Sequence, residues 1–346
     1  MKGRQILVEP LPAGGHAAAL MVDGRLEDLL VDPSPADPTP RPEAIYRAVP
    51  GRPMKGLGGA IVDLGGGLSG FLRGAKLPAP GRPLLVQVSG WAEAGKAPPV
   101  SARLLLKGRT AILTPDAPGI NVARSLRDAG RRAELAALAG AAMAGAEAAL
   151  GLILRSAAGD AADGNAADGA IAEEIAGLRR AWEELAAGGP PGLVRAAPGA
   201  AAEALRDWYE PGTAVREAAT ALADAGIWEE VERLRDPAVP LGQGSMTVEP
   251  TRALVAVDVN TGGDLSPAAG LKANLAAAAE LPRQLRLRGL GGQIVVDFAP
   301  VPRADRPRVE RALTAALRRD SVDTTIAGWT PLGHLELQRK RARRPL

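Results

Sequence analysis

The sequence contains no cysteine and only two histidines, His16 and His334. The missing cysteines exclude disulfides, a thiol nucleophile and a thiolate zinc site. So few histidines also argue against a histidine-based catalytic triad or zinc cluster, and we expect no zinc. Chemistry carried by this chain would therefore rest on carboxylates, lysine and arginine, hydroxyl groups and a hard metal ion.

Aromatic side chains and long hydrophobic runs are also scarce. Aromatic residues make up 3% of the 346 residues, although hydrophobic residues as a class make up 46%. The longest weakly apolar tract, residues 133–154, carries Glu134 and Glu147, and the start of the chain lacks the apolar core of a signal peptide. We therefore expect a cytoplasmic protein without a membrane partner. The net charge of +3 is a weak indication of polyanionic partners.

Turn residues and hydrophobic periodicity divide the chain into segments. The first 32 residues are typical of strands, with a two-residue hairpin turn at Asp23 and Gly24. Short strand-like pieces separated by Gly and Pro between residues 45 and 106 predict a small barrel. The length allows two or three compact units. Helices are expected over residues 134–150, 171–187, 200–208, 215–234, 266–288 and 306–319.

Two segments share one design: LVAVDVNTGGD (residues 254–264) and GGQIVVDFAP (residues 291–300). Each is a Val, Ile and Leu run with an aspartate near its end, Asp258 or Asp297. Burying an unpaired carboxylate is costly, so this placement needs a reason. The helix expected between them makes a strand–helix–strand crossover, which predicts parallel strands with both aspartates at the carboxyl edge of one sheet.

Two converging carboxylates repel each other unless a cation lies between them. Magnesium suits this arrangement because it takes oxygen ligands and typically uses one or two carboxylates with water and phosphate. Asn260 follows Asp258 by two residues on the same strand face and is positioned to orient a carboxylate or a water. Either aspartate alone has a plainer explanation as the cap of a turn or helix, and that alternative stays open.

Three segments, TRALVAVDVNTGGD, KANLAAAAELPRQLRLRGLGGQIVVDFAP and GHLELQRKR, together resemble the catalytic segment of the ribonuclease E/G family. RQLRLRGLGG is the most specific part, and a weaker similarity extends over nearly the whole chain. The resemblance implies an α+β/α/β fold of several subdomains, with RNase H-like and DNase I-like α/β parts, an inserted OB-type β-barrel and a 5′-sensor subdomain. The implied boundaries are 1–35 and 204–243 for the two RNase H-like parts, 36–106 for the RNA-binding barrel, 107–203 for the sensor-like part and 244–346 for the DNase I-like catalytic part.

The same resemblance implies an enzyme: a Mg²⁺-dependent endoribonuclease that cleaves single-stranded RNA, in processing or decay, by metal-activated attack of water on the phosphodiester. Asp258 and Asp297 match the magnesium ligands of the family, and Asn260 matches its supporting asparagine. Its RNA-stacking aromatic matches Phe71, and a basic RNA contact matches Lys96 loosely. The alternative for Phe71 is an ordinary place in the barrel core.

Further RNA contacts are predicted outside the barrel. By the resemblance, Arg155 and Ser156 match the Arg-Thr pair that binds a 5′-phosphate; as a plain sequence feature, Arg155 is a solvated charge. Arg286 and Arg288 crowd the end of the crossover helix, where they either hold RNA phosphates or simply favour the helix dipole. The basic run at residues 339–344 suits contact with a polyanion or with solvent.

Several positions depart from the family pattern. Ile61 stands where a second stacking aromatic is expected, and Pro331-Leu332 replaces an arginine–phenylalanine pair. The cysteines of the zinc link that joins family protomers are missing, so a zinc-linked dimer is not expected and other self-association is open. These departures motivate an alternative, a catalytically weak or inactive RNA-binding or regulatory paralogue of the same fold. A third interpretation is a two-metal phosphoesterase that acts on small phosphates.

Overall fold

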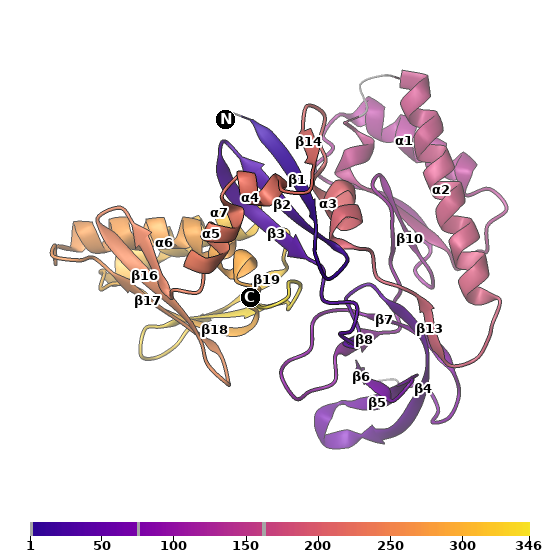
Figure 1. The fold of residues 1–346 in the computed structure, drawn as a ribbon, viewed down its shortest axis with the longest axis horizontal. Coiled ribbons are helices and arrows are strands. Elements are labelled where there is room, and N and C mark those ends of the chain that lie inside the picture. The colour runs from indigo at the N-terminus through magenta and orange to yellow at the C-terminus, as the bar shows by residue number, and fades with distance from the viewer. Residues whose placement is uncertain (1–2, 75–76, 161–163) are drawn as a thin grey trace. The chain divides into compact units, whose positions relative to one another are not determined.

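The computed structural model describes residues 3–74, 77–160 and 164–346 (Figure 1). These residues form two compact units of mixed α and β structure. Unit 1 joins Met1–Asp32 to Val215–Leu346, and unit 2 is Pro33–Ala214. Each unit contains two sheets, and each is described by itself below.

The first sheet of unit 1 has the order β14-β1-β2-β3. Its strands are β1 (Arg4–Pro10), β2 (His16–Val22), β3 (Arg25–Val31) and β14 (Ala214–Glu217). Asp23 and Gly24 form the predicted two-residue turn between β2 and β3, with φ angles of +50° and +79°. Positive φ at both central residues is what a type I′ hairpin turn requires, so this prediction is confirmed.

The expected helix over residues 215–234 was wrong in part. Its start pairs with β1 as strand β14, and the remainder forms two short helices, α4 (Ala221–Asp224) and α5 (Ile227–Arg233). Gly226 lies between them with a left-handed φ of +68°, which glycine adopts at no steric cost and which interrupts a helix. The helices bury Leu222 and Ile227 against the sheet.

The second sheet of unit 1 has the order β15-β16-β17-β18-β20-β19. Its strands are β15 (Ala238–Leu241), β16 (Gly244–Pro250), β17 (Val255–Asn260), β18 (Gly292–Asp297), β19 (Thr324–Trp329) and β20 (Leu335–Arg339). Strands β17 and β18 are parallel neighbours, as predicted, and the pairs β15–β16, β16–β17, β18–β20 and β19–β20 are antiparallel. Helix α6 (Pro267–Leu287) connects β17 to β18, and α7 (Arg306–Leu317) connects β18 to β19.

The ends of α6 follow from its sequence. Ser266 accepts a hydrogen bond from the amide of Ala269 as the N-cap, and Pro267 occupies the first turn, where no amide donor is needed. Gly289 follows the last turn with φ of +66°. Local sequence alone therefore predicted this helix correctly.

One face of this sheet is packed and the other is open. Val257 and Val259 of β17 and Val296 of β18 are buried in a core with side chains of α6 and α7. The alternating residues of the same strands are exposed or partly exposed, and Asp258 and Asp297 are among the exposed ones. Because side chains alternate along a strand, Asp258 and Asp297 belong to the open face, and neither carboxylate is buried.

Unit 2 contains a closed five-stranded barrel. Its strands are β4 (Ile45–Met54), β5 (Gly59–Gly65), β6 (Leu68–Arg73), β7 (Leu84–Val88) and β8 (Pro99–Ser101). They are ordered β4-β5-β6-β8-β7, and β7 pairs back with β4 to close the ring. The short strand β13 (Gly192–Arg195) adds to β4 from outside. This OB-like barrel confirms the small barrel that the sequence predicted.

The other part of unit 2 is a sheet packed against helices. Its elements are β9 (Leu106–Lys107), β10 (Ala111–Thr114), β11 (Gly119–Val122), β12 (Gly151–Leu154), α1 (Ala129–Ala142), α2 (Gly164–Ala186) and α3 (Ala200–Trp208). Helix α1 begins after the N-cap Asp128 and ends before residue 143, so the helix expected over 134–150 was displaced. Gly145, with φ of +72°, lies in the turn that follows it.

The mixed α/β architecture is therefore confirmed, and so is the barrel. The likeness of the remaining parts to RNase H and DNase I stays a prediction. In the part of the chain that the structure describes, no helix is both long enough and apolar enough to cross a membrane.

Candidate active site

The two aspartates are brought together by strand pairing. Asp258 of β17 lies directly opposite Asp297 of the parallel strand β18. Neighbouring strands are about 4.8 Å apart, so the two carboxylates project side by side from the open face. The prediction that the strands are adjacent and parallel is confirmed, and the carboxyl edge of β17 and β18 is an acidic site.

Asn260 supports the first of these carboxylates. Its side-chain amide donates a hydrogen bond to Oδ2 of Asp258 at 2.6 Å. Both residues lie on the open face of β17, two positions apart, which is why the contact forms. Thr247 of β16 lies opposite Asp258 on the other side. The amide restricts the orientation of Asp258, as the sequence indicated.

His334 is a site residue that sequence reasoning missed. Its Nε2 lies 3.7 Å from Oδ1 of Asp297, and 35% of its side chain is exposed. It precedes β20, whose Leu335 pairs with Val296 of β18, so His334 is the cross-strand neighbour of Asp297. The sequence indicated this residue only through its place, since one of the two histidines lies within the GHLELQRKR segment.

Asn274 of α6 was also missed. This side chain is fully buried, and it accepts a hydrogen bond from the amide of Ala299 and donates one to its carbonyl, both at 2.9 Å. The reciprocal pair fixes the chain two residues after Asp297. The sequence indicates such a contact by a single asparagine among the alanines of α6, because an amide side chain buried there needs hydrogen-bond partners.

The donor set of this edge fits a hard divalent cation. Two carboxylates on one exposed edge can bind magnesium, which takes its remaining ligands from water and substrate phosphate. Among the described residues, no group of three or more His, Cys, Asp and Glu side chains is arranged to hold a metal ion. No described lysine or arginine forms an ion pair with Asp258 or Asp297. An added cation would therefore relieve the mutual repulsion of the carboxylates.

The structure gives Arg286 and Arg288 partners inside unit 1. Arg286 is paired with Asp320 at 2.6 Å and donates to the carbonyl of Glu27 at 2.6 Å, and 11% of its side chain is exposed. Arg288 is buried and donates to the carbonyl of Asp236 at 2.8 Å. The RQLRLRGLGG segment thus attaches α6 to the neighbouring sheet and helices, and both guanidinium groups are engaged by partners within unit 1.

Part of the basic run at residues 339–344 has the same internal function. Arg339 is 1% exposed and is paired with Asp320 at 2.6 Å. Arg343 donates to both carboxylate oxygens of Asp28, at 2.9 and 3.2 Å. The buried carboxylates of Asp320 and Asp28 are therefore paired with guanidinium groups, which compensates charges that would be costly to bury alone.

The predicted RNA contacts of the barrel lie on its outer face. Phe71 pairs across the strands with Ile61, and both are at least partly exposed, whereas the next residue, Leu72, is in the barrel core. The alternative that Phe71 is a core residue is therefore not what the structure shows. The guanidinium of Arg73 lies 5.9 Å from the centre of its ring. Gly59 leaves room for the ring, because a Cβ there would lie 2.5 Å from it.

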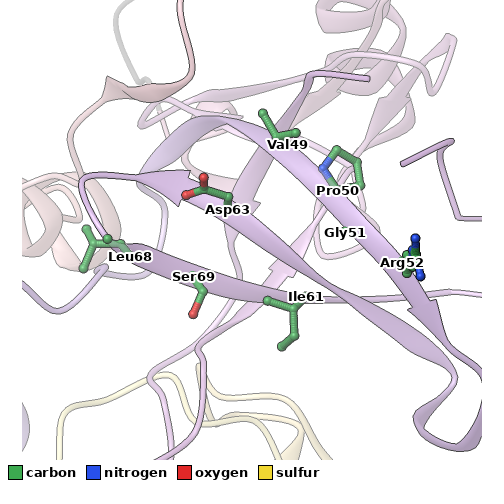
Figure 2. Close-up of a pocket in the computed structure, with 9 residues that line it drawn as sticks. Val49, Pro50, Gly51, Arg52, Ile61, Asp63, Leu68 and Ser69 are labelled. Carbon is green, nitrogen blue, oxygen red and sulfur yellow. The ribbon is translucent and has the colours of Figure 1, made fainter. Parts of the chain in front are cut away.

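A shallow groove of about 470 Å³ lies on the same barrel, between β4, β5 and β6 (Figure 2). Ile61, the position of the missing aromatic, forms part of its lining. The remaining lining residues are Val49, Pro50, Gly51, Arg52, Asp63, Gly67, Leu68 and Ser69. Lys96 lies elsewhere on the barrel unit, with 69% of its side chain exposed and an ion pair to Glu93 at 2.5 Å.

Arg155 and Ser156 occupy the start of a short 3-10 helix, η2 (Ser156–Ala158). Ser156 is exposed. The guanidinium of Arg155 donates to the carbonyl of Gly108 at 2.7 Å and is paired with Asp207 of α3 at 2.8 Å. Asp207 also forms an ion pair with Arg206. An anion that binds Arg155 must compete with the Asp207 carboxylate, which the sequence did not reveal.

Fold and site together define a class of protein. The chain is a mixed α/β protein with a closed barrel in one unit and, in the other, a sheet edge on which two carboxylates lie side by side, a donor set that suits a hard divalent cation. Paired carboxylates on an open sheet face can hold a cation against a phosphate, and the open face leaves space for a substrate.

Comparison with known proteins identifies the family. Residues 213–342 match the sequence model of the ribonuclease E/G family. Ribonuclease E of Nostoc sp. is 30% identical over 310 residues, which are 77% of this chain and 44% of that protein. Ribonuclease G of Salmonella typhimurium is 37% identical over 123 residues, 34% of this chain and 25% of the relative. A chloroplastic ribonuclease E/G-like protein of Arabidopsis thaliana is 38% identical over 125 residues, 34% of this chain and 12% of the relative.

The chain therefore belongs to the ribonuclease E/G family. The matched region contains both aspartates, Asn260, Asn274 and His334. The chain spans less than half of the length of each of these relatives.

Proposed function

We propose that this chain is a Mg²⁺-dependent endoribonuclease that cleaves single-stranded RNA, with Asp258, Asn260 and Asp297 as its catalytic residues. The observation that carries the proposal is the register of β17 and β18, which sets two carboxylates side by side on an exposed edge. Membership of the ribonuclease E/G family selects RNA from among the possible phosphate esters.

Asp258 and Asp297 would hold the cation, which when bound supplies positive charge to the scissile phosphate and lowers the pKa of an attacking water. Asn260 keeps Asp258 in one orientation through the 2.6 Å hydrogen bond. Asn274 keeps the chain beside Asp297 in place through Ala299. Because α6 and α7 pack on the other face of the sheet, an extended polymer can approach both carboxylates from the open face of unit 1.

In unit 2 we propose that Phe71 stacks on an RNA base and that Lys96 contacts the backbone. The exposure of both side chains supports this, and base stacking on an aromatic ring is worth about 1–3 kcal/mol. Arg155 and Ser156 would bind a 5′-phosphate only by displacing Asp207, so we expect a weak dependence on the 5′ end. The five-subdomain division and the cytoplasmic location stay predictions.

The test is cleavage of a 5′-labelled, A/U-rich single-stranded RNA in the presence of Mg²⁺. We expect internal cuts by the wild type and a rate at least about 100-fold lower for Asp297→Asn, because one of two cation ligands is lost. The matched control is Glu249→Gln, which removes a carboxylate from the same sheet at an exposed position opposite Ala256. The control should cut like the wild type.

Two other outcomes would lead to different conclusions. Equal cutting by Asp297→Asn and the wild type would refute the proposed site. Tight RNA binding without cutting by the wild type would support the alternative of an RNA-binding paralogue. Comparison of 5′-monophosphate and 5′-triphosphate substrates would then test Arg155, with Asp207→Asn as the variant that releases it from its ion pair.

A further inference from the structure

His334 lies at one end of a row of side chains that crosses the sheet. Thr247, Asp258 and Asp297 lie opposite one another on β16, β17 and β18, and His334 continues the row beside β20. Leu335, the residue after His334, is fully buried. Because side chains alternate, His334 belongs to the same open face as the two aspartates.

The backbone that carries His334 is held firmly. The amide of Thr330 donates to the carbonyl of His334 at 2.8 Å, and the amide of His334 donates to the hydroxyl of Thr330 at 3.1 Å. Trp329, at the start of the same loop, contacts the ring of Phe298 with centroids 5.9 Å apart and donates to Glu310. These contacts fix the backbone position of His334 beside the site, which favours a function in binding.

The imidazole is near Asp297 but is not hydrogen-bonded to it. The 3.7 Å separation of Nε2 and Oδ1 exceeds the reach of an N–H···O bond. A neutral imidazole carries one N–H donor, on Nδ1 or Nε2. The gap leaves this N–H available to a third group on the open face, 35% of the side chain being exposed.

A phosphate is the group that this position suits. Asp258 and Asp297 together repel an anion, and no described lysine or arginine is paired with either of them. An N–H donor beside the pair offsets part of that repulsion without occupying a cation-binding oxygen. Hydrogen bonds to charged acceptors are stronger than those between neutral groups.

We propose that His334 is a further substrate-contacting residue of this site, and that its imidazole N–H donates a hydrogen bond to a non-bridging phosphate oxygen of RNA beside Asp297. This inference rests on the proposed function, because it places the scissile phosphate at the aspartate pair. It assigns His334 a positioning contact with the substrate and requires no change in its protonation.

The test compares His334→Leu, which removes the donor at similar size, with His334→Gln, which restores an N–H donor. The other histidine supplies the control, His16→Leu, in the first sheet of unit 1. We expect His334→Leu to lower kcat/KM for RNA by about 10- to 100-fold, His334→Gln to recover most of the loss, and His16→Leu to match the wild type. Far-UV circular dichroism checks that each variant is folded.

Two readouts separate a phosphate contact from a general disturbance of the site. In EDTA, His334→Leu should bind single-stranded RNA at least about threefold more weakly by fluorescence anisotropy, while His16→Leu binds normally. A single Rp or Sp phosphorothioate at the cleavage site should slow cleavage by the wild type relative to unmodified RNA. In His334→Leu this slowing should disappear for one diastereomer and persist for the other. Such selective non-additivity indicates a direct contact with one oxygen.

Unchanged binding in EDTA, or two unchanged phosphorothioate penalties, would overturn the assignment of His334. Failure of His334→Gln to recover any activity or affinity would also overturn it. The Asp297→Asn variant separates a failure of the histidine contact from a failure of the proposed function. If Asp297→Asn is inactive and His334→Leu is fully active, only the histidine contact is refuted. If the wild type does not cut RNA, the anisotropy measurement still decides whether His334 contacts it.

Discussion

Replacing Arg286 with methionine should destabilise unit 1 and leave RNA affinity unchanged. Arg286 makes two hydrogen bonds to the carbonyl of Glu27, at 2.6 and 3.2 Å. It also forms ion pairs with Asp320 at 2.6 Å, Asp28 at 3.4 Å and the Glu27 carboxylate at 3.6 Å. Removing one partner of a buried ion pair costs about 3–5 kcal/mol because the other charge stays buried. In the variant, Asp320 is still paired with Arg339, and methionine retains the apolar part of the arginine side chain. We therefore expect the free energy of unfolding to fall by about 3 kcal/mol, at the lower end of that range.

The assay is urea unfolding followed by circular dichroism and tryptophan fluorescence, with RNA affinity measured at a temperature at which the variant is folded. Arg308→Met is the matched control, since Arg308 is 53% exposed and its ion pair with Asp305 lies within one helical turn. Its loss should cost less than about 0.5 kcal/mol. A stable Arg286→Met protein with weakened RNA binding would refute this reasoning and restore the sequence-based prediction of an RNA contact.

Asn274→Ala should lower the free energy of unfolding by about 2–4 kcal/mol and slow RNA cleavage, because both backbone groups of Ala299 lose their partner. Urea midpoints and cleavage rates check this prediction. A change in unfolding free energy below about 1 kcal/mol would contradict it. Burial alone would raise the pKa of Glu43, but hydrogen bonds and charge from Arg206 and Lys107 outweigh it and hold the pKa below the ordinary 4.5. The stabilisation from Glu43 should therefore be complete above pH 4.5 and lost as the pH falls through its lower folded-state pKa. Glu43→Gln should flatten the fall in stability between about pH 5 and 3, measured as urea midpoints; an unchanged fall would contradict it.

Features that depend on a few neighbouring residues were predictable from the sequence. Asp23-Gly24 predicted a hairpin turn because few other residue pairs adopt positive φ twice in succession. The helix expected over residues 266–288 was found as α6, because its capping residues, Ser266, Pro267 and Gly289, act locally. The crossover between the two valine-rich segments predicted parallel strands, because that connection permits little else.

Other expectations depended on distant contacts and were incomplete. The helix expected over residues 215–234 loses its start to strand β14, since pairing with β1 outweighs local propensity. The strands that carry Asp258 and Asp297 read as buried because their apolar runs are nearly continuous. Only the packing of α6 and α7 shows that one face is open.

The sequence by itself determined the family resemblance, the barrel, the parallel strand pair and the two aspartates, because each is written in contiguous residues. Tertiary structure alone decided the partners of the arginines and the place of His334. In the sequence, Arg286 and Arg288 suit either a phosphate contact or the dipole of the helix, and their internal partners, Asp320 and the carbonyl of Asp236, are set by the fold. His334 reaches Asp297 through the antiparallel register of β18 and β20, and a register between distant strands is set by packing rather than by neighbouring residues.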